Sequence, residues 1–256
     1  MNKSKRRCDC LELKQGVIKE IVGNAKEYVK IHPEYVGLLL CEGNAESIDV
    51  KLYRKVYPYL HVIPTGGWPQ IKGIFSSVKS KMNGFPVFAI TDRDAKSKGE
   101  VRELEKLGIY CTKLPFIENI ISAPEIVKTI GRYYDMELEC GLDYVKEKLL
   151  YLLSASLRDT LPVNILHSEE DAVASITFTI RLKNGKNIEK TVNESNIIYA
   201  YRDKAVANET ADIFGIIGRR SYYRFFAECL DTPELCERIV RRARTYLPDI
   251  QFEITD

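Results

Sequence analysis

The stretch of sequence that decides the fold is Gly37-Leu38-Leu39-Leu40-Cys41-Glu42-Gly43-Asn44-Ala45-Glu46. Its apolar half is a short continuous run, which is typical of a strand buried on both faces of a parallel sheet. The run ends in the carboxylate of Glu42 and in Gly43, a residue that lets the backbone turn sharply. A second run, Pro86-Val87-Phe88-Ala89-Ile90-Thr91, ends in the same way in Asp92-Arg93-Asp94. Two buried strands that end in acidic residues indicate a site for a hard metal ion.

The segments around these runs alternate between helical and extended patterns. Helices are predicted over residues 11–31, 44–57, 70–82 and 99–107, and strands over residues 36–41, 60–63, 86–91 and 108–111. This alternation is typical of a parallel sheet covered by helices, in which short right-handed crossovers bring the carboxyl ends of the strands to one edge. The predicted fold class is therefore α/β, a Rossmann-like parallel sheet flanked by helices.

The pattern changes after residue 119. Helices are predicted over residues 120–130, 142–158 and much of 195–247. Residues 172–182 alternate as a half-buried strand does, and the turn Lys183-Asn184-Gly185-Lys186 leads into a second strand over residues 187–192. The Asn-Gly pair is typical of a type I′ hairpin turn. We expect a first domain over residues 1–135 and a mostly helical extension over residues 136–256 with a β-hairpin near 172–192.

The composition is that of an ordinary globular protein. The chain has 256 residues, of which 45% are hydrophobic, so it can bury a sizeable core. It contains no apolar run long enough for a transmembrane helix, and no apolar signal segment follows its basic first residues. The seven cysteines are scattered and odd in number, which argues against a disulfide framework and favours a reducing compartment. We expect a cytoplasmic protein without a membrane partner.

Four carboxylates are expected to converge at the carboxyl edge of the sheet. Glu46 follows Glu42 by four residues and would share its side of a helix, while Asp92 and Asp94 would share one side of an extended chain. Such a cluster repels itself unless a cation neutralises it, and Mg²⁺ or Mn²⁺ prefers oxygen ligands. The alternative is that each carboxylate caps a helix N-terminus, where the helix dipole stabilises it. Because both pairs occur in the same context, we favour the metal site.

These residues carry a resemblance to a known family. Glu42-Gly43-x-x-Glu46 after one strand and Asp92-x-Asp94 after a later strand resemble the TOPRIM domain, the Mg²⁺-binding fold of topoisomerases, bacterial primases and certain nucleases. A closer resemblance is to the TOPRIM domain of OLD-family nucleases and of the related DUF4435 proteins, which include the nuclease-like subunit of the PARIS anti-phage system. The resemblance covers about residues 36–130, with support from the segments Val62-Ile63-Pro64-Thr65-Gly66-Gly67 and Phe116-Ile117-Glu118-Asn119.

The resemblance implies roles for particular residues. It implies that Glu42 is a metal ligand or general base, that Asp92 and Asp94 bind the metal, and that Glu46 helps with a second ion. Glu118 is a further candidate ligand, with a buried helix cap as the alternative. The chain has no P-loop of the G-x-x-x-x-G-K-[ST] form, so an ATPase would be a separate partner.

Basic residues collect toward the C-terminus. Between residues 219 and 244, seven arginines stand against four acidic residues, and aromatic residues lie among the first arginines. Arginine binds phosphate bidentately and aromatic rings stack on bases. The candidates for nucleic-acid contact are Arg93, Lys204, Arg219, Arg220 and Arg224. The alternatives are a solvated helix surface, core packing of the aromatic residues, and pairing of Arg93 with a neighbouring carboxylate.

The predicted function is metal-dependent hydrolysis of phosphodiester bonds in DNA or RNA, with tRNA among the substrates to consider. The catalytic residues would be Glu42, Asp92 and Asp94, and the chain would act as a toxic effector of anti-phage defence with an ABC-type ATPase partner. A homodimer would suit a nuclease that cuts two strands. The alternative is a non-catalytic TOPRIM-like module that binds a partner ATPase or nucleic acid. The clustered carboxylates favour the enzyme, because a scaffold gains nothing from clustering like charges.

Overall fold

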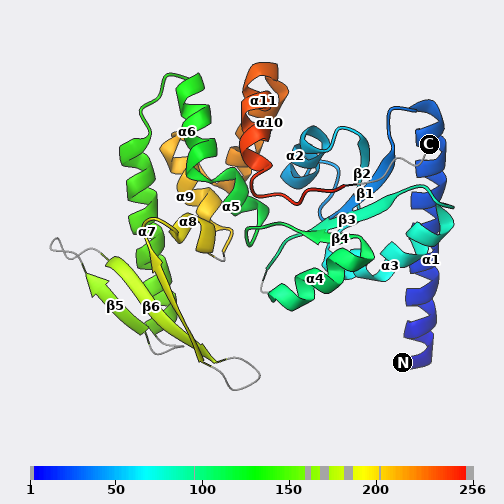
Figure 1. Cartoon of the computed structure of the whole chain (residues 1–256), viewed down its shortest axis with the longest axis horizontal. Coiled ribbons are helices and arrows are strands. Elements are labelled where there is room, and N and C mark those ends of the chain that lie inside the picture. The colour runs from blue at the N-terminus through cyan, green and yellow to red at the C-terminus, as the bar shows by residue number, and fades with distance from the viewer. Residues whose placement is uncertain are drawn as a thin grey trace. The chain divides into compact units, whose positions relative to one another are not determined.

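A computed structural model describes residues 3–94, 96–158, 163–167, 173–181, 187–201 and 203–251 of the chain (Figure 1). The chain divides into two compact units. The first unit comprises Met1–Lys113 together with Leu247–Asp256, and the second comprises Leu114–Tyr246. The division therefore lies earlier in the chain than the predicted boundary near residue 135, and the C-terminal segment belongs to the first unit.

The described part of the first unit is built on a four-stranded parallel sheet. Its strands are β1 (Gly37–Cys41), β2 (Leu60–Pro64), β3 (Val87–Thr91) and β4 (Ile109–Cys111), in the order β2-β1-β3-β4. Its helices are α1 (Lys3–Ile31), α2 (Ile48–Val56), α3 (Trp68–Lys81) and α4 (Lys98–Leu107). Neighbouring strands pair in parallel throughout. The predicted α/β class, a parallel sheet flanked by helices, is confirmed.

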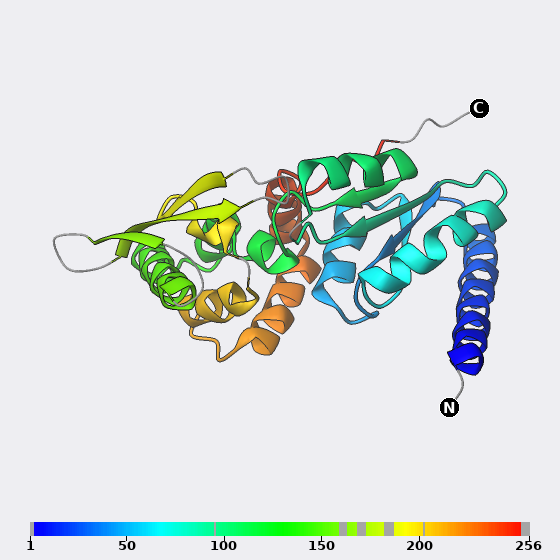
Figure 2. The ribbon, with the colours of Figure 1, turned by 90° about the horizontal axis from the view of Figure 1, so that it is seen from below.

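The central strand β1 is buried on both faces. Leu38, Leu39, Leu40 and Cys41 are all completely inaccessible to solvent. Leu38 and Leu40 belong to a core formed with side chains of α1 and α3, which lie side by side against the sheet (Figure 2). Leu39 and Cys41 point to the opposite face because side chains alternate along a strand. This two-sided burial explains why the strand reads as a continuous apolar run.

The helix after β1 begins later than predicted. Residues 44–47 form a tight turn, in which Asn44 N donates to Ser47 Oγ at 2.8 Å and Glu46 N donates to Asn44 Oδ1 at 3.0 Å. The side chains of Asn and Ser compete in this way with helical backbone bonding. Because α2 starts only at Ile48, helical spacing does not place Glu46 beside Glu42.

The described part of the second unit combines helices with a small antiparallel sheet. The helices are α5 (Ile117–Ile121), α6 (Pro124–Tyr133), α7 (Glu139–Arg158), α8 (Ile197–Ala200), α9 (Ala205–Ile213), α10 (Arg219–Asp231) and α11 (Pro233–Ala243). The strands are β5 (Val163–His167), β6 (Val173–Arg181) and β7 (Asn187–Asn193), in the order β5-β6-β7. Of the described helices, none has the length and apolar character that a membrane crossing needs.

The predicted hairpin strands are present, but the sheet is larger than a hairpin. β6 and β7 pair antiparallel over the predicted residues, and β5, which the sequence did not reveal, pairs with the other edge of β6. The sheet packs on α7 (Figure 2). The predicted turn Lys183–Lys186 lies outside the described residues. Five residues of weak alternation are too few to distinguish β5 from a loop.

Residues 114–135 belong to the second unit because α5 and α6 share its interior. Asn119 is completely buried, and its Nδ2 donates to the carbonyl oxygens of Ile198 at 2.7 Å and Tyr201 at 2.8 Å. The hydroxyl of Tyr222 donates to the carbonyl oxygen of Ile121 at 2.8 Å. These bonds join residues far apart in the sequence, so no local pattern marks the true division of the chain.

Candidate functional site at the carboxyl edge of the parallel sheet

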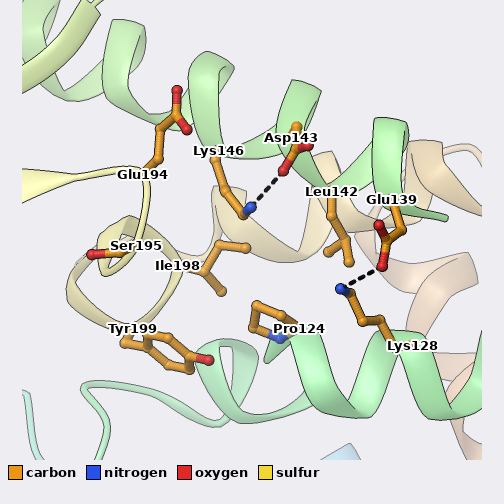
Figure 3. A pocket seen from close by; sticks show the side chains of 10 residues that line it. All are labelled: Pro124, Lys128, Glu139, Leu142, Asp143, Lys146, Glu194, Ser195, Ile198 and Tyr199. Atoms are coloured by element: carbon orange, nitrogen blue, oxygen red, sulfur yellow. Dashed lines mark hydrogen bonds and ion pairs between the residues drawn. The ribbon is translucent and has the colours of Figure 1, made fainter.

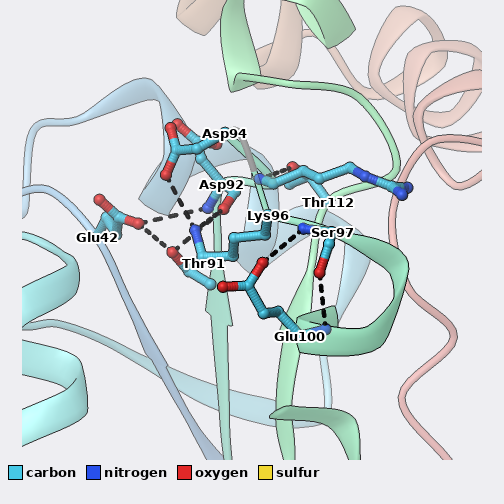
Figure 4. A network of polar contacts seen from close by, with 9 residues as sticks. Glu42, Thr91, Asp92, Asp94, Lys96, Ser97, Glu100 and Thr112 are labelled. Carbon is cyan, nitrogen blue, oxygen red and sulfur yellow. Dashed lines mark hydrogen bonds and ion pairs between the residues drawn. The ribbon is translucent and has the colours of Figure 1, made fainter. Parts of the chain in front are cut away.

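Glu42 and Asp92 follow neighbouring strands and meet at the carboxyl edge of the sheet (Figure 4). β1 and β3 run parallel with Cys41 opposite Ile90, so the residues that follow both strands emerge side by side. The hydroxyl of Thr91 donates a hydrogen bond to Glu42 Oε1, and the backbone N–H of Asp92 donates to the same oxygen at 3.3 Å. Oε2 of Glu42 receives no hydrogen bond from the described residues. One carboxylate oxygen is therefore held and the other is available to a ligand.

Gly43 makes the turn that brings Glu42 to this position. Its φ is +91°, and a Cβ at this position would lie 2.5 Å from Ser47 Oγ. Its N–H donates to the carbonyl of Gly66 at 2.5 Å, and the N–H of Gly66 donates back to the carbonyl of Gly43 at 3.0 Å. The hydroxyl of Thr65 also donates to the carbonyl of Cys41, at 3.1 Å. These bonds join the loop after β1 to the loop after β2 and hold the backbone next to Glu42 in place.

Asp94 does not extend the strand as predicted. Its φ of +47° places it in the left-handed region, so the alternation of an extended chain does not set the direction of its side chain. Its Oδ2 accepts a hydrogen bond from Lys96 Nζ at 3.0 Å, and the same ammonium donates to the backbone oxygen of Asp92 at 2.6 Å. Lys96 Nζ also lies 5.1 Å from the ring centroid of Trp68. Lys96 thus brings a positive charge into the predicted carboxylate cluster.

The sequence pattern did not identify Lys96 as a site residue, although Asp92, Asp94 and Lys96 are spaced two residues apart. Arg93 was the predicted positive charge in this segment. The backbone N–H of Arg93 donates to Thr112 Oγ1 at 3.0 Å, which ties the segment to the end of β4. The guanidinium of Arg93 forms no ion pair with the described residues, so pairing with a neighbouring carboxylate is not what the structure shows.

Glu46 lies apart from the other carboxylates. Its side chain is 86% exposed, and its Oε2 lies 3.8 Å from Lys51 Nζ. Within the described segments, no group of three or more His, Cys, Asp or Glu side chains is placed to hold a metal ion. The site is therefore a pair of carboxylates, Glu42 and Asp92, beside an ion pair, Asp94 and Lys96, and not the predicted cluster of four carboxylates.

Three other predicted residues come together in the second unit. Glu118, on α5, is 2% exposed, and its Oε1 accepts a hydrogen bond from the hydroxyl of Tyr223 and lies 3.5 Å from Lys204 Nζ. The guanidinium carbon of Arg219 lies 6.0 Å from the ring centroid of Tyr223. Oε2 of Glu118 has no hydrogen-bond partner in the described part of the chain. Glu118 is thus a buried carboxylate next to a lysine, in a different unit from Glu42.

The two remaining predicted arginines are solvent-facing. Arg220 and Arg224 are exposed and lie four residues apart on one side of α10. Two of the aromatic residues among them belong to the interior, because Tyr222 and Phe226 are completely buried. The core interpretation of these two aromatic residues is confirmed, and the role of the arginines stays a prediction.

The cysteines near the site are not poised to react. Burial raises the pKa of the Cys41 thiol, and the nearby Asp49 carboxylate raises it further. Burial also raises the pKa of Cys111, and the positive charge of Lys96 opposes that shift. Since the thiolate is the nucleophile, neither cysteine is suited to nucleophilic catalysis at neutral pH. The chemistry at this edge of the sheet belongs to the carboxylates and the cations.

Comparisons with protein-family models, with curated proteins and with solved structures find no match for this chain.

Proposed function

We propose that the chain is a Mg²⁺-dependent nuclease of the TOPRIM type that hydrolyses phosphodiester bonds in DNA or RNA. The observation that supports this proposal is the meeting of Glu42 and Asp92 at the ends of adjacent parallel strands. Ligands of open α/β sheets bind outside the carboxyl ends of the strands. Two carboxylates at that place attract a cation and, through it, a phosphate.

The donor set suits Mg²⁺ when a substrate completes it. Mg²⁺ keeps several of its waters and is usually bound by one or two carboxylates together with substrate phosphates. Glu42 and Asp92 supply that number, and Glu42 Oε2 receives no hydrogen bond from the described residues. When bound there, Mg²⁺ or Mn²⁺ would supply the Lewis acidity that activates water at neutral pH.

The chain's own residues orient the reacting groups. Thr91 and the N–H of Asp92 hold Glu42 in one orientation, so that it can bind the metal or accept a proton from the attacking water. Lys96 places a positive charge beside the carboxylates, with its Nζ 3.0 Å from Asp94 Oδ2 and 2.6 Å from the backbone oxygen of Asp92. Cations positioned in this way stabilise the charge that develops on a phosphodiester in the transition state.

The biological setting that we propose rests on the resemblance to OLD-family and DUF4435 proteins. In that setting the chain is a toxic effector of anti-phage defence in the cytoplasm, acts with a separately encoded ATPase, and cuts as a homodimer. Arg219, Arg220, Arg224 and Lys204 would help to bind the nucleic acid.

The test is cleavage of DNA and RNA by wild type and by Glu42→Gln, with Mg²⁺, with Mn²⁺ and with a chelator. We expect Glu42→Gln to lower the cleavage rate about a hundredfold or more, because it removes a carboxylate that binds the metal or accepts the proton. The matched control is Glu103→Gln on α4, whose exposed carboxylate pairs with Lys106 at 2.6 Å. It should cleave like wild type.

Equal cleavage by wild type and Glu42→Gln would overturn the proposal, provided that circular dichroism shows both variants folded. Calorimetric titration with Mg²⁺ adds an independent readout, because Glu42→Gln should also weaken metal binding. Cleavage that persists in chelator would show that the activity does not need the ion.

The ion pair of Asp94 with Lys96 favours a second candidate, a non-catalytic module that binds a partner ATPase or nucleic acid. In that case the lysine already offsets the acidic cluster and no metal is needed. This candidate requires binding that is indifferent to Mg²⁺ and to Glu42→Gln, together with an absence of cleavage by wild type.

A further inference from the structure

Four arginines gather around one pocket of the second unit. The pocket has a volume of ≈ 240 Å³ and is lined by Thr129 and Arg132 of α6 and by Arg238, Arg241 and Arg242 of α11. α6 and α11 pack against each other (Figure 1). Arg132 is remote in sequence from the other three arginines, so the pocket exists only in the folded unit.

Helical spacing explains why α11 presents its arginines together. Leu235, Ile239 and Ala243 lie four residues apart and are completely buried, which fixes the inward face of the helix. The three arginines lie three and four residues apart on another side of α11. On α6, Thr129 and Arg132 are likewise three residues apart, and Ile126, Val127 and Ile130 are buried.

Among the described residues, two of the four arginines form ion pairs and two do not. Arg238 pairs with Glu234 at 2.5 Å, and Arg241 pairs with Glu237 at 3.1 Å, both within α11. Arg132 and Arg242 are exposed and form no ion pair in the part of the chain that the structure describes. Neighbouring guanidinium groups repel one another, so an anion that enters this pocket relieves the repulsion.

A nearby pocket shows the contrasting arrangement. It has a volume of ≈ 260 Å³ and lies among α6, α7 and α8 (Figure 3). Its lysines are already neutralised, Lys128 by Glu139 at 2.9 Å and Lys146 by Asp143 at 2.5 Å. Lys128 lowers the pKa of Glu139 most, and Arg132 lowers it to a smaller extent. The direct ion pair of Glu139 is with Lys128, so Glu139 does not pair with an arginine of the arginine pocket.

We infer that the pocket between α6 and α11 binds the phosphate backbone of a nucleic acid. Arginine suits phosphate because its planar guanidinium offers two parallel N–H donors and always carries its charge. Tyr133 follows Thr129 by four residues, lies on the same side of α6 and is 36% exposed. Its ring lies outside the pocket lining and contacts the Tyr134 ring edge-on, at a centroid distance of 5.2 Å. Positive charge together with aromatic rings is the combination that single-stranded nucleic-acid sites use. This inference rests on the proposed function and adds a second contact surface to the predicted arginines of α10.

The test measures binding of a fluorescein-labelled single-stranded oligonucleotide by fluorescence anisotropy in chelator, so that no cleavage occurs. The variant is Arg132→Gln/Arg242→Gln, and the matched control is Lys98→Gln/Arg102→Gln, which removes the same charge from exposed positions on α4. We expect the first variant to bind about fivefold more weakly per arginine near 0.1 M salt, with a salt slope shallower by about 0.7 per arginine. The control should bind like wild type.

The conservative variant Arg132→Lys/Arg242→Lys keeps the charge and loses the two-pronged geometry. Its affinity for the oligonucleotide should lie between those of wild type and the glutamine variant. If the glutamine variant does not fold, the lysine variant still provides the test. Unchanged affinity in the glutamine variant, or in the lysine variant if only that one folds, would overturn the inference. Equally tight binding of polyglutamate, lost in the same variant, would overturn the assignment to nucleic acid and identify a site for an acidic protein.

These outcomes separate the pocket from the nuclease. Loss of binding in the arginine variant, with no cleavage by wild type, would keep the pocket and reject the nuclease. Cleavage by wild type, with unchanged binding in the arginine variant, would reject the pocket alone.

Discussion

At the residue scale, the distinctive feature of the candidate site is the ion pair of Asp94 with Lys96. Lys96 is only 12% exposed and donates to both Asp94 Oδ2 and the backbone oxygen of Asp92. At the metal site that we propose, a lysine held in this way would compete with the ion for the same negative charge.

Replacing Lys96 by methionine should make the protein depend more on Mg²⁺. Without the ammonium, the acidic side chains are no longer offset, and a hydrogen bond to a charged group worth about 1.5–3 kcal/mol is lost. We expect Lys96→Met to unfold at a lower temperature than wild type without metal, and to gain more than wild type in melting temperature when Mg²⁺ is added, because binding to the folded state stabilises it. Thermal melts across a Mg²⁺ titration measure both effects.

The matched control is Lys106→Met on α4, which removes an exposed ammonium paired with Glu103 at 2.6 Å. Exposed pairs contribute about 0–1 kcal/mol, so its melting temperature and its Mg²⁺ response should stay near those of wild type. An identical Mg²⁺ response of Lys96→Met and Lys106→Met would contradict this account of Lys96.

At the element scale, the loops after β1 and β2 act together to position Glu42. Gly43 and Gly66 both have positive φ and exchange two backbone hydrogen bonds. Gly43 also lies against Ser47, so the tight turn before α2 leaves no room for a side chain. β1 places Glu42 at the edge of the sheet, and the two loops fix the backbone conformation that orients its side chain.

Gly43→Ala should destabilise the protein and disturb Glu42. A left-handed alanine costs about 1 kcal/mol in backbone strain, and the added methyl group would meet Ser47. Gly84→Ala is the matched control, because Gly84 has a φ of +85° with nothing within 4 Å of the added Cβ. Urea unfolding should show a loss of about 1 kcal/mol for the control and a clearly larger loss for Gly43→Ala. Equal losses would show that the contact with Ser47 yields without cost.

At the scale of the whole molecule, the two units draw on different parts of the chain. The carbonyl of Pro248 accepts a hydrogen bond from the hydroxyl of Tyr57 at 2.7 Å, so the C-terminal segment returns to the first unit. Asn119 performs the corresponding role in the second unit, because it joins α5 to the segment around α8. In each unit, a hydrogen bond between residues far apart in the sequence joins segments that come from different parts of the chain.

Asn119→Ala should therefore loosen the second unit and leave the first intact. The substitution leaves two buried carbonyl groups without a donor, which we expect to cost about 3 kcal/mol. Hydrogen exchange followed by mass spectrometry should show faster exchange in α8 and α9, and unchanged exchange in β1 and β3. Asn208→Ala, which removes one exposed bond from the N–H of Arg219, is the control and should leave both units unchanged. Equal acceleration in β1 would show that the units unfold as one.

The sequence was sufficient to predict the parallel sheet and the place of Glu42 and Asp92 at the ends of its strands. A strand buried on both faces must be apolar throughout, as Leu38 to Cys41 are, and parallel crossovers bring the strand ends to one edge. Glu42 and Asp92 could be predicted because each comes directly after such a strand. These features could be predicted because local sequence patterns indicate which residues are buried and whether a segment is a helix or a strand.

Tertiary packing decided the rest. Asp94 adopts a left-handed conformation, and the long side chain of Lys96 contacts both the Asp94 carboxylate and the Trp68 ring. Glu118 meets Lys204, and Arg132 meets the arginines of α11, only because helices distant in sequence pack together. The free energy of such contacts depends on where the partner residue lies in space. The residues next to it in the sequence do not indicate that position.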